Sequence, residues 1–168
     1  SPEPWSEHVN PERVDDALSQ WFDPSVTSRI YPCKSGMNAF FSAYEAINRI
    51  QSRRGRRGWI SVGWLYLDTL QILERYLPEG WTTAWFRDPT DTDSIVDYIN
   101  SHGKSVAGLI LETPGNPLVQ TADVARISRA CRRAGIITVM DPSLSSPQNV
   151  DLSPWCDVVA CSLTKYAI

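Results

Sequence analysis

Three segments in the second half of the chain are apolar almost without a break, at residues 106–112 (VAGLILE), 136–141 (IITVMD) and 157–162 (DVVACS). A strand with one face in water alternates apolar and polar residues, so a continuously apolar strand must be covered on both faces. A segment with helical periodicity, residues 121–135, separates the first two of these strands. This alternation predicts an α/β fold with three layers (α/β/α), in which helices cover both faces of a mostly parallel sheet.

The first half of the chain continues the same alternation. We predict helices at residues 11–22, 36–51, 66–77, 91–102 and 121–135, and strands at residues 59–63, 82–86, 106–112, 136–141 and 157–162. Pro11 suits the first turn of the first helix, and Gly135 suits the end of the last one. A length of 168 residues fits one domain with a substantial core, so we expect residues 1–168 to form a single domain.

Composition argues against several classes of function. The net charge of −3 argues against binding nucleic acid, and the arginines at residues 49–57 are interpreted as a solvated helix end and loop. No apolar run approaches the roughly 20 residues that span a bilayer, and the first ten residues do not resemble a signal peptide. The four cysteines form no Cys-x-x-Cys pair and no zinc-ligand spacing. We therefore predict free thiols, no metal site and a cytoplasmic location.

Polar residues follow the predicted strands at the point where each strand ends. Asn116 lies in TPGNP after strand 106–112, Asp141 ends strand 136–141, and Lys165 follows the last strand in SLTK. Ligands of parallel α/β sheets bind beyond the carboxyl ends of the strands. The amide, the carboxylate and the lysine are therefore expected at one edge of the sheet.

A fourth element suits an anion. Ser35 and Gly36 begin the predicted helix 36–51, and the N-terminus of a helix presents unpaired N–H groups and positive potential. The hydroxyls of Ser162 and Thr164 are further donors. Pyridoxal phosphate (PLP) needs a lysine amine, a carboxylate that keeps its ring nitrogen protonated, and donors for its phosphate. The combined pattern predicts a PLP site.

Each of these residues also has an ordinary interpretation. A lysine near a chain end is usually a solvated charge. Asp141 precedes a proline and Asn116 precedes Pro117, and both arrangements commonly form turns. The apolar strand before Lys165 and the hydroxyls beside it favour a reactive lysine.

Four stretches carry a resemblance to a known family: SGM at 35–37, LETPGNPL at 111–118, VMDPSLSSP at 139–147 and CSLTKY at 161–166. In this order and spacing they resemble the Cys/Met metabolism group of PLP enzymes. This group includes cystathionine γ-synthase, cystathionine lyases, methionine γ-lyase and O-acylhomoserine sulfhydrylases. The resemblance extends from about residue 10 to the end, and implies the large domain of the PLP-dependent transferase fold (fold type I).

The resemblance implies a role for each matching residue. Lys165 matches the lysine that forms the Schiff base and moves protons, and Asp141 matches the partner of the ring nitrogen. Tyr66 matches the tyrosine that stacks on the ring and serves as acid or base, although an aromatic residue near a helix start often only packs. The implied phosphate site comprises Ser35, Gly36, Met37, Ser162 and Thr164. Asn116 matches the residue near the phenolic oxygen, and Ser143 replaces a threonine against the ring.

The chain also departs from the family pattern. Tyr66, Leu67, Asp68 and Thr69 replace Tyr-Gly-Gly-Thr, and Pro142 replaces an asparagine after the cofactor aspartate. Upstream, Trp5 and Glu7 stand where a Tyr-x-Arg normally reaches the phosphate of a neighbouring subunit. Family members continue past the lysine into a smaller C-terminal domain. We therefore expect a truncated large domain without that small domain, inactive by itself.

The sequence supports three functional hypotheses. The first is a PLP-dependent lyase or transferase that acts on sulfur-containing or O-acylated amino acids, by elimination or replacement at the β or γ carbon. It implies an amino-acid substrate and, because active sites of this group form between subunits, a homodimer or homotetramer. The second is a domain that binds PLP or a partner without turnover. The third, a nucleotide-binding α/β domain, lacks both glycine-rich phosphate motifs.

Overall fold

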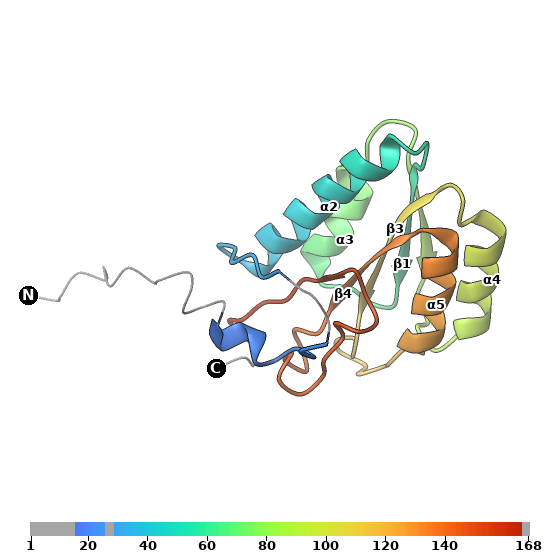
Figure 1. Cartoon of the computed structure of the whole chain (residues 1–168). Helices are drawn as coiled ribbons and strands as arrows, with labels where there is room; N and C mark the ends of the chain where they lie inside the picture. Colours follow the sequence, from blue (N-terminus) through green and yellow to red (C-terminus); the bar gives the residue numbers. More distant parts are fainter. Residues whose placement is uncertain (1–15, 26–28, 166–168) are drawn as a thin grey trace, which may run out of the picture.

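The computed structural model describes residues 16–25 and 29–165. Its centre is a sheet of five strands in the order β2-β1-β3-β4-β5, and every pair of neighbours is parallel (Figure 1). The strands are β1 (Gly58–Val62), β2 (Thr82–Phe86), β3 (Val106–Glu112), β4 (Ile137–Asp141) and β5 (Val158–Val159).

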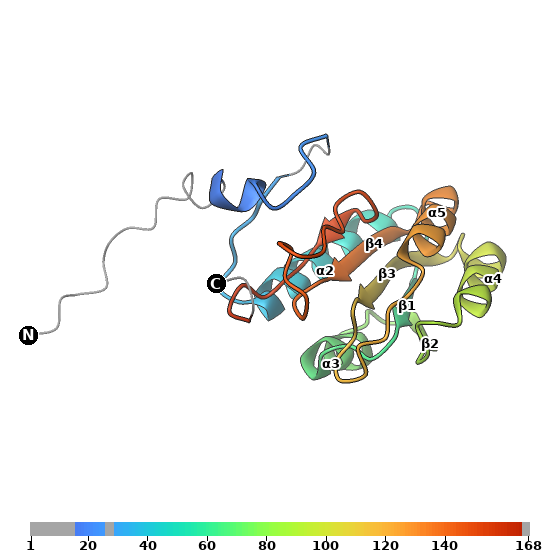
Figure 2. The same ribbon diagram turned by 90° about the horizontal axis from the view of Figure 1, so that it is seen from below.

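Helices cover both faces of this sheet. They are α2 (Gly36–Ser52), α3 (Leu67–Arg75), α4 (Thr92–His102) and α5 (Val124–Ala134). Helices α2 and α3 lie on one face, and α4 and α5 lie on the other (Figures 1 and 2). The predicted three-layer α/β/α fold with a parallel sheet is confirmed.

The two faces of the sheet have separate apolar cores. Leu109 and Leu111 of β3 pack toward α4 and α5, whereas Ile110 packs toward α2 and α3. Because side chains alternate along a strand, every position of β3 is buried, which explains its unbroken apolar run. The same alternation directs Glu112 toward the α2/α3 face of the sheet.

The predicted boundaries differ from the structure mainly at two helices and one strand. Helix α5 begins at Val124 because the side chain of Asp123 caps it by accepting a hydrogen bond from the N–H of Arg126 (2.9 Å). Of the first predicted helix, residues 16–19 are helical, and its first residues, with Pro11, lie outside the described residues.

The predicted strand 157–162 is wrong in length, since only Val158 and Val159 pair as strand residues. The Ala160 N–H still donates to the Met140 carbonyl (3.0 Å). Two residues later the backbone leaves the hydrogen-bond ladder between β4 and β5, because the Ser162 N–H donates to the Ser143 side chain (2.7 Å). A hydroxyl thus takes the place of a strand partner.

Two side-chain donors, the partly buried Arg56 and the buried Gln51, stabilise the amino-end edge of the sheet. The Arg56 guanidinium donates to the carbonyls of Gly103 (2.7 Å), Val106 (2.9 Å) and Ala134 (2.6 Å). The Gln51 amide donates to the carbonyls of Ala107 and Gly135, each at 3.0 Å. These bonds satisfy carbonyls at the ends of α4 and α5 and at the start of β3, so this edge is closed by contacts within the fold.

Candidate functional site

The strand order places a topological switch point between β1 and β3. In parallel sheets of the order 2-1-3-4-5, ligands bind at this point, beyond the carboxyl ends of the strands. The loop after β1 carries Tyr66, and β3 ends at Glu112. The backbone N–H of Tyr66 donates to Glu112 Oε2 (2.9 Å), so the two flanks of the switch point are directly joined.

Two carboxylates lie next to each other at this edge. Glu112 and Asp141 are register partners on β3 and β4, so their side chains project on the same side of the sheet, the side of α2 and α3. Glu112 is only 8% exposed. Burial, aided by the charge of Asp141, raises the pKa of Glu112 to about 7, although backbone N–H groups of Tyr66 and Asn116 act in the opposite direction.

Asp141 is held by the segment that follows it. Its Oδ1 accepts a hydrogen bond from the backbone N–H of Ser143 (2.8 Å). Burial raises the pKa of Asp141, and its hydrogen bonds with Ser143 partly oppose this rise. Among the described residues neither Asp141 nor Glu112 forms an ion pair. The two carboxyl groups therefore have no cationic partner within the described chain, and a cationic ligand can pair with them.

A row of hydroxyls continues from Asp141. Ser143 Oγ accepts the N–H of Ser162 (2.7 Å), and Ser162 Oγ lies 2.9 Å from Thr164 Oγ1. Neighbouring hydroxyls at this spacing can donate to the same anion.

The N-terminus of α2 lies against these hydroxyls. A Cβ on Gly36 would lie 3.0 Å from Ser162 Cβ, so any side chain there would force the two segments apart by a few tenths of an ångström. Ser35 caps the helix by accepting the N–H of Asn38 (3.1 Å). The N–H groups of Gly36 and Met37 precede the first intrahelical bond and have no acceptor among the described residues, so they can bind a ligand. The helix end and the hydroxyls form a cradle suited to phosphate.

The remaining predicted site residues are more exposed. Tyr66 is the N-cap of α3 and is 53% exposed. Met37 Sδ lies 3.8 Å from Thr69 Oγ1, so the starts of α2 and α3 are in contact. Asn116 lies in the exposed loop after β3, and Lys165 is exposed next to Thr164. The structure thus groups Gly36, Met37, Asp141, Ser143, Ser162 and Thr164 closely, while Asn116 and the Lys165 amine have no described contact with that group.

Glu112 is the buried site residue that the sequence analysis did not single out. A useful signal was present, because Glu112 is the one acid at the end of an otherwise apolar strand. A buried acid in such a position is a frequent mark of a functional site.

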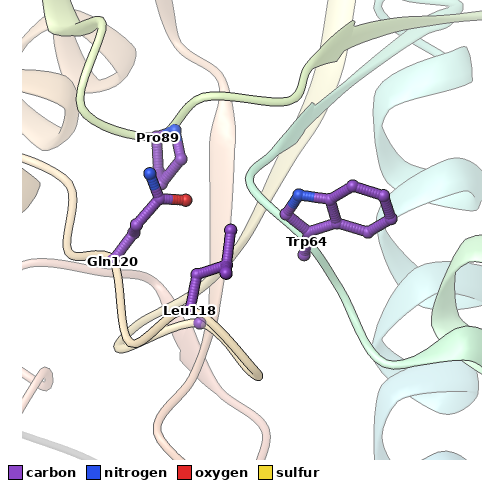
Figure 3. A pocket seen from close by; sticks show the side chains of 5 residues that line it. Trp64, Pro89, Leu118 and Gln120 are labelled. Carbon is purple, nitrogen blue, oxygen red and sulfur yellow. The ribbon is translucent and has the colours of Figure 1, made fainter.

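A small hollow opens beside the switch point (Figure 3). It is lined by residues from the loops that follow β1, β2 and β3: Trp64, Pro89, Gly115, Leu118 and Gln120. The Arg87 guanidinium lies 5.4 Å from the ring centres of Trp64 and Trp85. These contacts hold a cationic side chain against the ring of Trp64, which lines the hollow.

Metal and thiol chemistry are not indicated in the described part of the chain. Those residues contain no cluster of three metal-ligating side chains, and no described helix is long and apolar enough to cross a membrane. All four cysteines are free. Burial and the charge of Asp141 raise the pKa of Cys161 to about 11, so this thiol stays protonated at neutral pH.

The residues fit a phosphorylated, cationic cofactor, and the fold belongs to a known class. Gly36, Ser162 and Thr164 form an anion cradle, and Asp141 supplies a carboxylate on the same side of the sheet. The structure of metB from Corynebacterium glutamicum covers 79% of this chain and 32% of its own length, with a TM-score of 0.64 and 19% identity. That likeness shows the fold, which is fold type I of the PLP-dependent enzymes.

Sequence comparison then gives the family. Residues 26–168 match the family described as "Cys/Met metabolism PLP-dependent enzyme". The chain is 35% identical over 156 residues to the L-2-amino-4-chloropent-4-enoate dechlorinase/desaturase of Streptantibioticus cattleyicolor. It is 34% identical over 138 residues to the cystathionine gamma-synthase of Neurospora crassa. The chain belongs to this family, whose cofactor is pyridoxal phosphate, as the four motifs predicted.

The matches cover most of this chain but only part of each relative. They include 93% of the chain and 31% of the dechlorinase/desaturase, and 81% of the chain and 22% of the synthase. Because the family and the named relatives are enzymes, the alternative of a non-catalytic domain that binds PLP or a partner is not favoured.

Proposed function

We propose that the protein is a PLP-dependent lyase or transferase that eliminates or replaces a leaving group at the β or γ carbon of an amino acid. The observation that carries this proposal is the placement of Asp141 and the Gly36–Ser162 cradle on one side of the carboxyl edge, with Lys165 three residues after Ser162. Bound PLP supplies an electron sink for the electrons released at the substrate's α carbon.

The chain's own residues divide the work of holding the cofactor. The N–H groups of Gly36 and Met37, with the hydroxyls of Ser162 and Thr164, bind the phosphate. Ser35 supports this cradle by capping α2. Asp141 keeps a proton on the ring nitrogen, since a buried carboxylate without a cationic partner attracts positive charge.

The remaining residues act at the ring and the substrate. Lys165 would hold the cofactor through its side-chain amine, and the same amine would accept the proton from the substrate's α carbon. Tyr66 would lie against the cofactor ring and serve as a second acid or base. Asn116 would contact the cofactor near its phenolic oxygen, and Ser143 would contact its ring.

The relatives indicate the class of substrate. Cystathionine gamma-synthase is a name from sulfur amino-acid metabolism, and the S. cattleyicolor relative is named for a substrate with chlorine at carbon 4. Carbon 4 of an amino acid is its γ carbon. We propose a sulfur-containing or O-acylated amino acid as substrate, with chemistry that extends to other γ leaving groups.

Domain, assembly and location complete the proposal. Residues 1–168 form one cofactor-binding domain of a homodimeric or homotetrameric, cytoplasmic enzyme. The free cysteines support the proposed location. The oligomeric state expected from the family resemblance supports the proposed assembly.

Trapping the cofactor tests the proposal. We expect purified protein mixed with PLP to develop a visible absorbance band, and borohydride reduction to attach the label to the peptide that contains Lys165. Lys165→Ala should lose the band and the label, whereas Lys104→Ala, which alters an exposed lysine before β3, should keep both. Label spread over surface lysines in the unchanged protein would contradict the proposed function.

A further inference from the structure

We propose that Glu112 is a positioning residue of the cofactor site, because its carboxyl group ties the loop after β1 to the end of β3, next to Asp141 on β4, and so sets the place of Tyr66. This inference rests on the proposed function. It assigns a role to a residue that touches other parts of the protein, so it can be tested apart from the chemistry.

The position of Glu112 should destabilise the fold, which suggests that the residue has a function there. It ends β3, a strand whose other six residues are apolar or glycine, and it is 8% exposed. Burial of a carboxyl group without a cationic partner destabilises a fold. A leucine would fill the same strand end without that cost.

The contacts of Glu112 define the task. Oε2 accepts the backbone N–H of Tyr66 (2.9 Å), and the N–H of Asn116 also acts on the carboxyl group. Tyr66 is the N-cap of α3, yet its own side chain makes no capping bond. Glu112 therefore supplies the acceptor at the start of α3, where the helix dipole favours a negative group. One side chain joins both loops that flank the switch point.

The neighbour of Glu112 links this task to the cofactor. Asp141 is its register partner and is the charged group that acts on it from the adjacent strand. Burial, and after it repulsion from Asp141, favours a protonated Glu112 when the site holds no cation. A cationic cofactor beside Asp141 would offset the repulsion, which shifts Glu112 toward its ionised form and makes its bond to the Tyr66 N–H charge-assisted and stronger. The arrival of the cofactor thereby tightens the loop that carries Tyr66.

Two substitutions at Glu112 and one control test this role. Glu112→Leu removes the acceptor, and Glu112→Gln keeps one acceptor oxygen but removes the charge. Gln51→Leu is the control, because Gln51 is a buried hydrogen-bonding side chain near the opposite end of β3. The dissociation constant of PLP is measured by absorbance at pH 6 and pH 8, together with the circular dichroism of the bound cofactor band, which reports how the ring is seated.

We expect Glu112→Leu to weaken PLP binding about tenfold and to reduce the dichroism per bound PLP. Glu112→Gln should bind about threefold more weakly at pH 8 and like the unchanged protein at pH 6, because only an ionised Glu112 strengthens the Tyr66 bond. Gln51→Leu should lower the free energy of unfolding without changing either cofactor readout.

The outcomes separate the two proposals. Unchanged affinity and dichroism in a folded Glu112→Leu overturn the positioning role while the proposed function stands. Should Glu112→Leu fail to fold, an unchanged pH 8 affinity of Glu112→Gln overturns the role in the same way. An equal change in the Gln51→Leu control also overturns it, since the effect would then follow stability. Unchanged protein that binds no PLP at Lys165 contradicts the proposed function itself.

Discussion

The two edges of the sheet both carry buried or partly buried polar side chains, but these make different contacts. At the amino-end edge, Arg56 and Gln51 donate to five backbone carbonyls, and every bond is internal to the fold. At the carboxyl edge, Glu112 and Asp141 lie side by side without an ion pair among the described residues, and the N–H groups of Gly36 and Met37 remain open.

This difference indicates that the amino-end edge stabilises the fold, whereas the carboxyl edge binds a ligand. Satisfied polar groups at the amino-end edge stabilise the folded chain. The buried carboxyl group of Glu112 and its partly buried neighbour Asp141 destabilise it until a cationic ligand binds, a compromise that is common at functional sites. Substitutions at the first edge should change folding alone, and substitutions at the second should change binding.

Removal of Arg56 should give the largest effect. We expect Arg56→Ala to lower the free energy of unfolding by about 4 kcal/mol, because three carbonyls lose a charged donor at once. Urea unfolding at pH 7 measures this loss. The neighbouring Arg57→Ala, which alters an exposed side chain, should stay within about 0.5 kcal/mol of the unchanged protein. A large loss of PLP affinity in folded Arg56→Ala would contradict the view that the amino-end edge affects folding alone.

The pH dependence of stability should give the next largest effect. The unfolded chain releases the Glu112 proton near pH 4.5, whereas the folded chain keeps it until about pH 7. The stability that Glu112 contributes is therefore complete below pH 4.5 and is lost as the pH rises through 7, a loss of roughly 3 kcal/mol. Glu112→Gln lacks this loss.

Urea unfolding at pH 5 and pH 8 tests the expectation in protein without PLP. The free energy of unfolding of Glu112→Gln should rise relative to that of the unchanged protein between these two values. Parallel behaviour of the two proteins would show that Glu112 ionises normally and that the carboxyl edge carries no such strain.

A methyl group at the start of α2 should give the smallest effect. In Gly36→Ala the new Cβ meets Ser162 Cβ at 3.0 Å, so the cradle must open by a few tenths of an ångström. We expect PLP affinity to fall about fivefold, which corresponds to roughly 1 kcal/mol. Gly58→Ala is the matched control at the amino-end edge, where the new Cβ has 3.5 Å to its nearest atom. Equal affinities of the two variants would place the phosphate elsewhere.

Most of the fold was predictable because its signals are local. The bounds of β2 and β3 agree with the predicted strands, and α5 is capped by Gly135, which adopts the left-handed conformation (φ 71°) that glycine favours. Strand β5 was not predictable in length, since an apolar run does not show whether it is paired. Its ladder stops because Ser143, from another loop, competes for the Ser162 N–H.

The candidate site divides in the same way. Asp141 and Ser162 were identified because each follows an apolar strand. The importance of Glu112 depends on facts that only the fold supplies: β4 is the neighbour of β3, and Glu112 is in register with Asp141. Its bond to Tyr66 spans 46 residues of sequence. No local pattern reveals such a contact.

The strand order also has a consequence for how the protein is made. β1 lies between β2 and β3, yet Val106 at the start of β3 follows Val62 at the end of β1 by 44 residues. At a synthesis rate of about 5–20 residues per second, β1 waits roughly 2–9 s for its second neighbour. During that time β1 can pair only with β2, and its other edge is open to wrong partners. Ser162 and Thr164 of the cradle are synthesised later still. The open edge of β1 must therefore avoid wrong pairing before the chain can bind a cofactor.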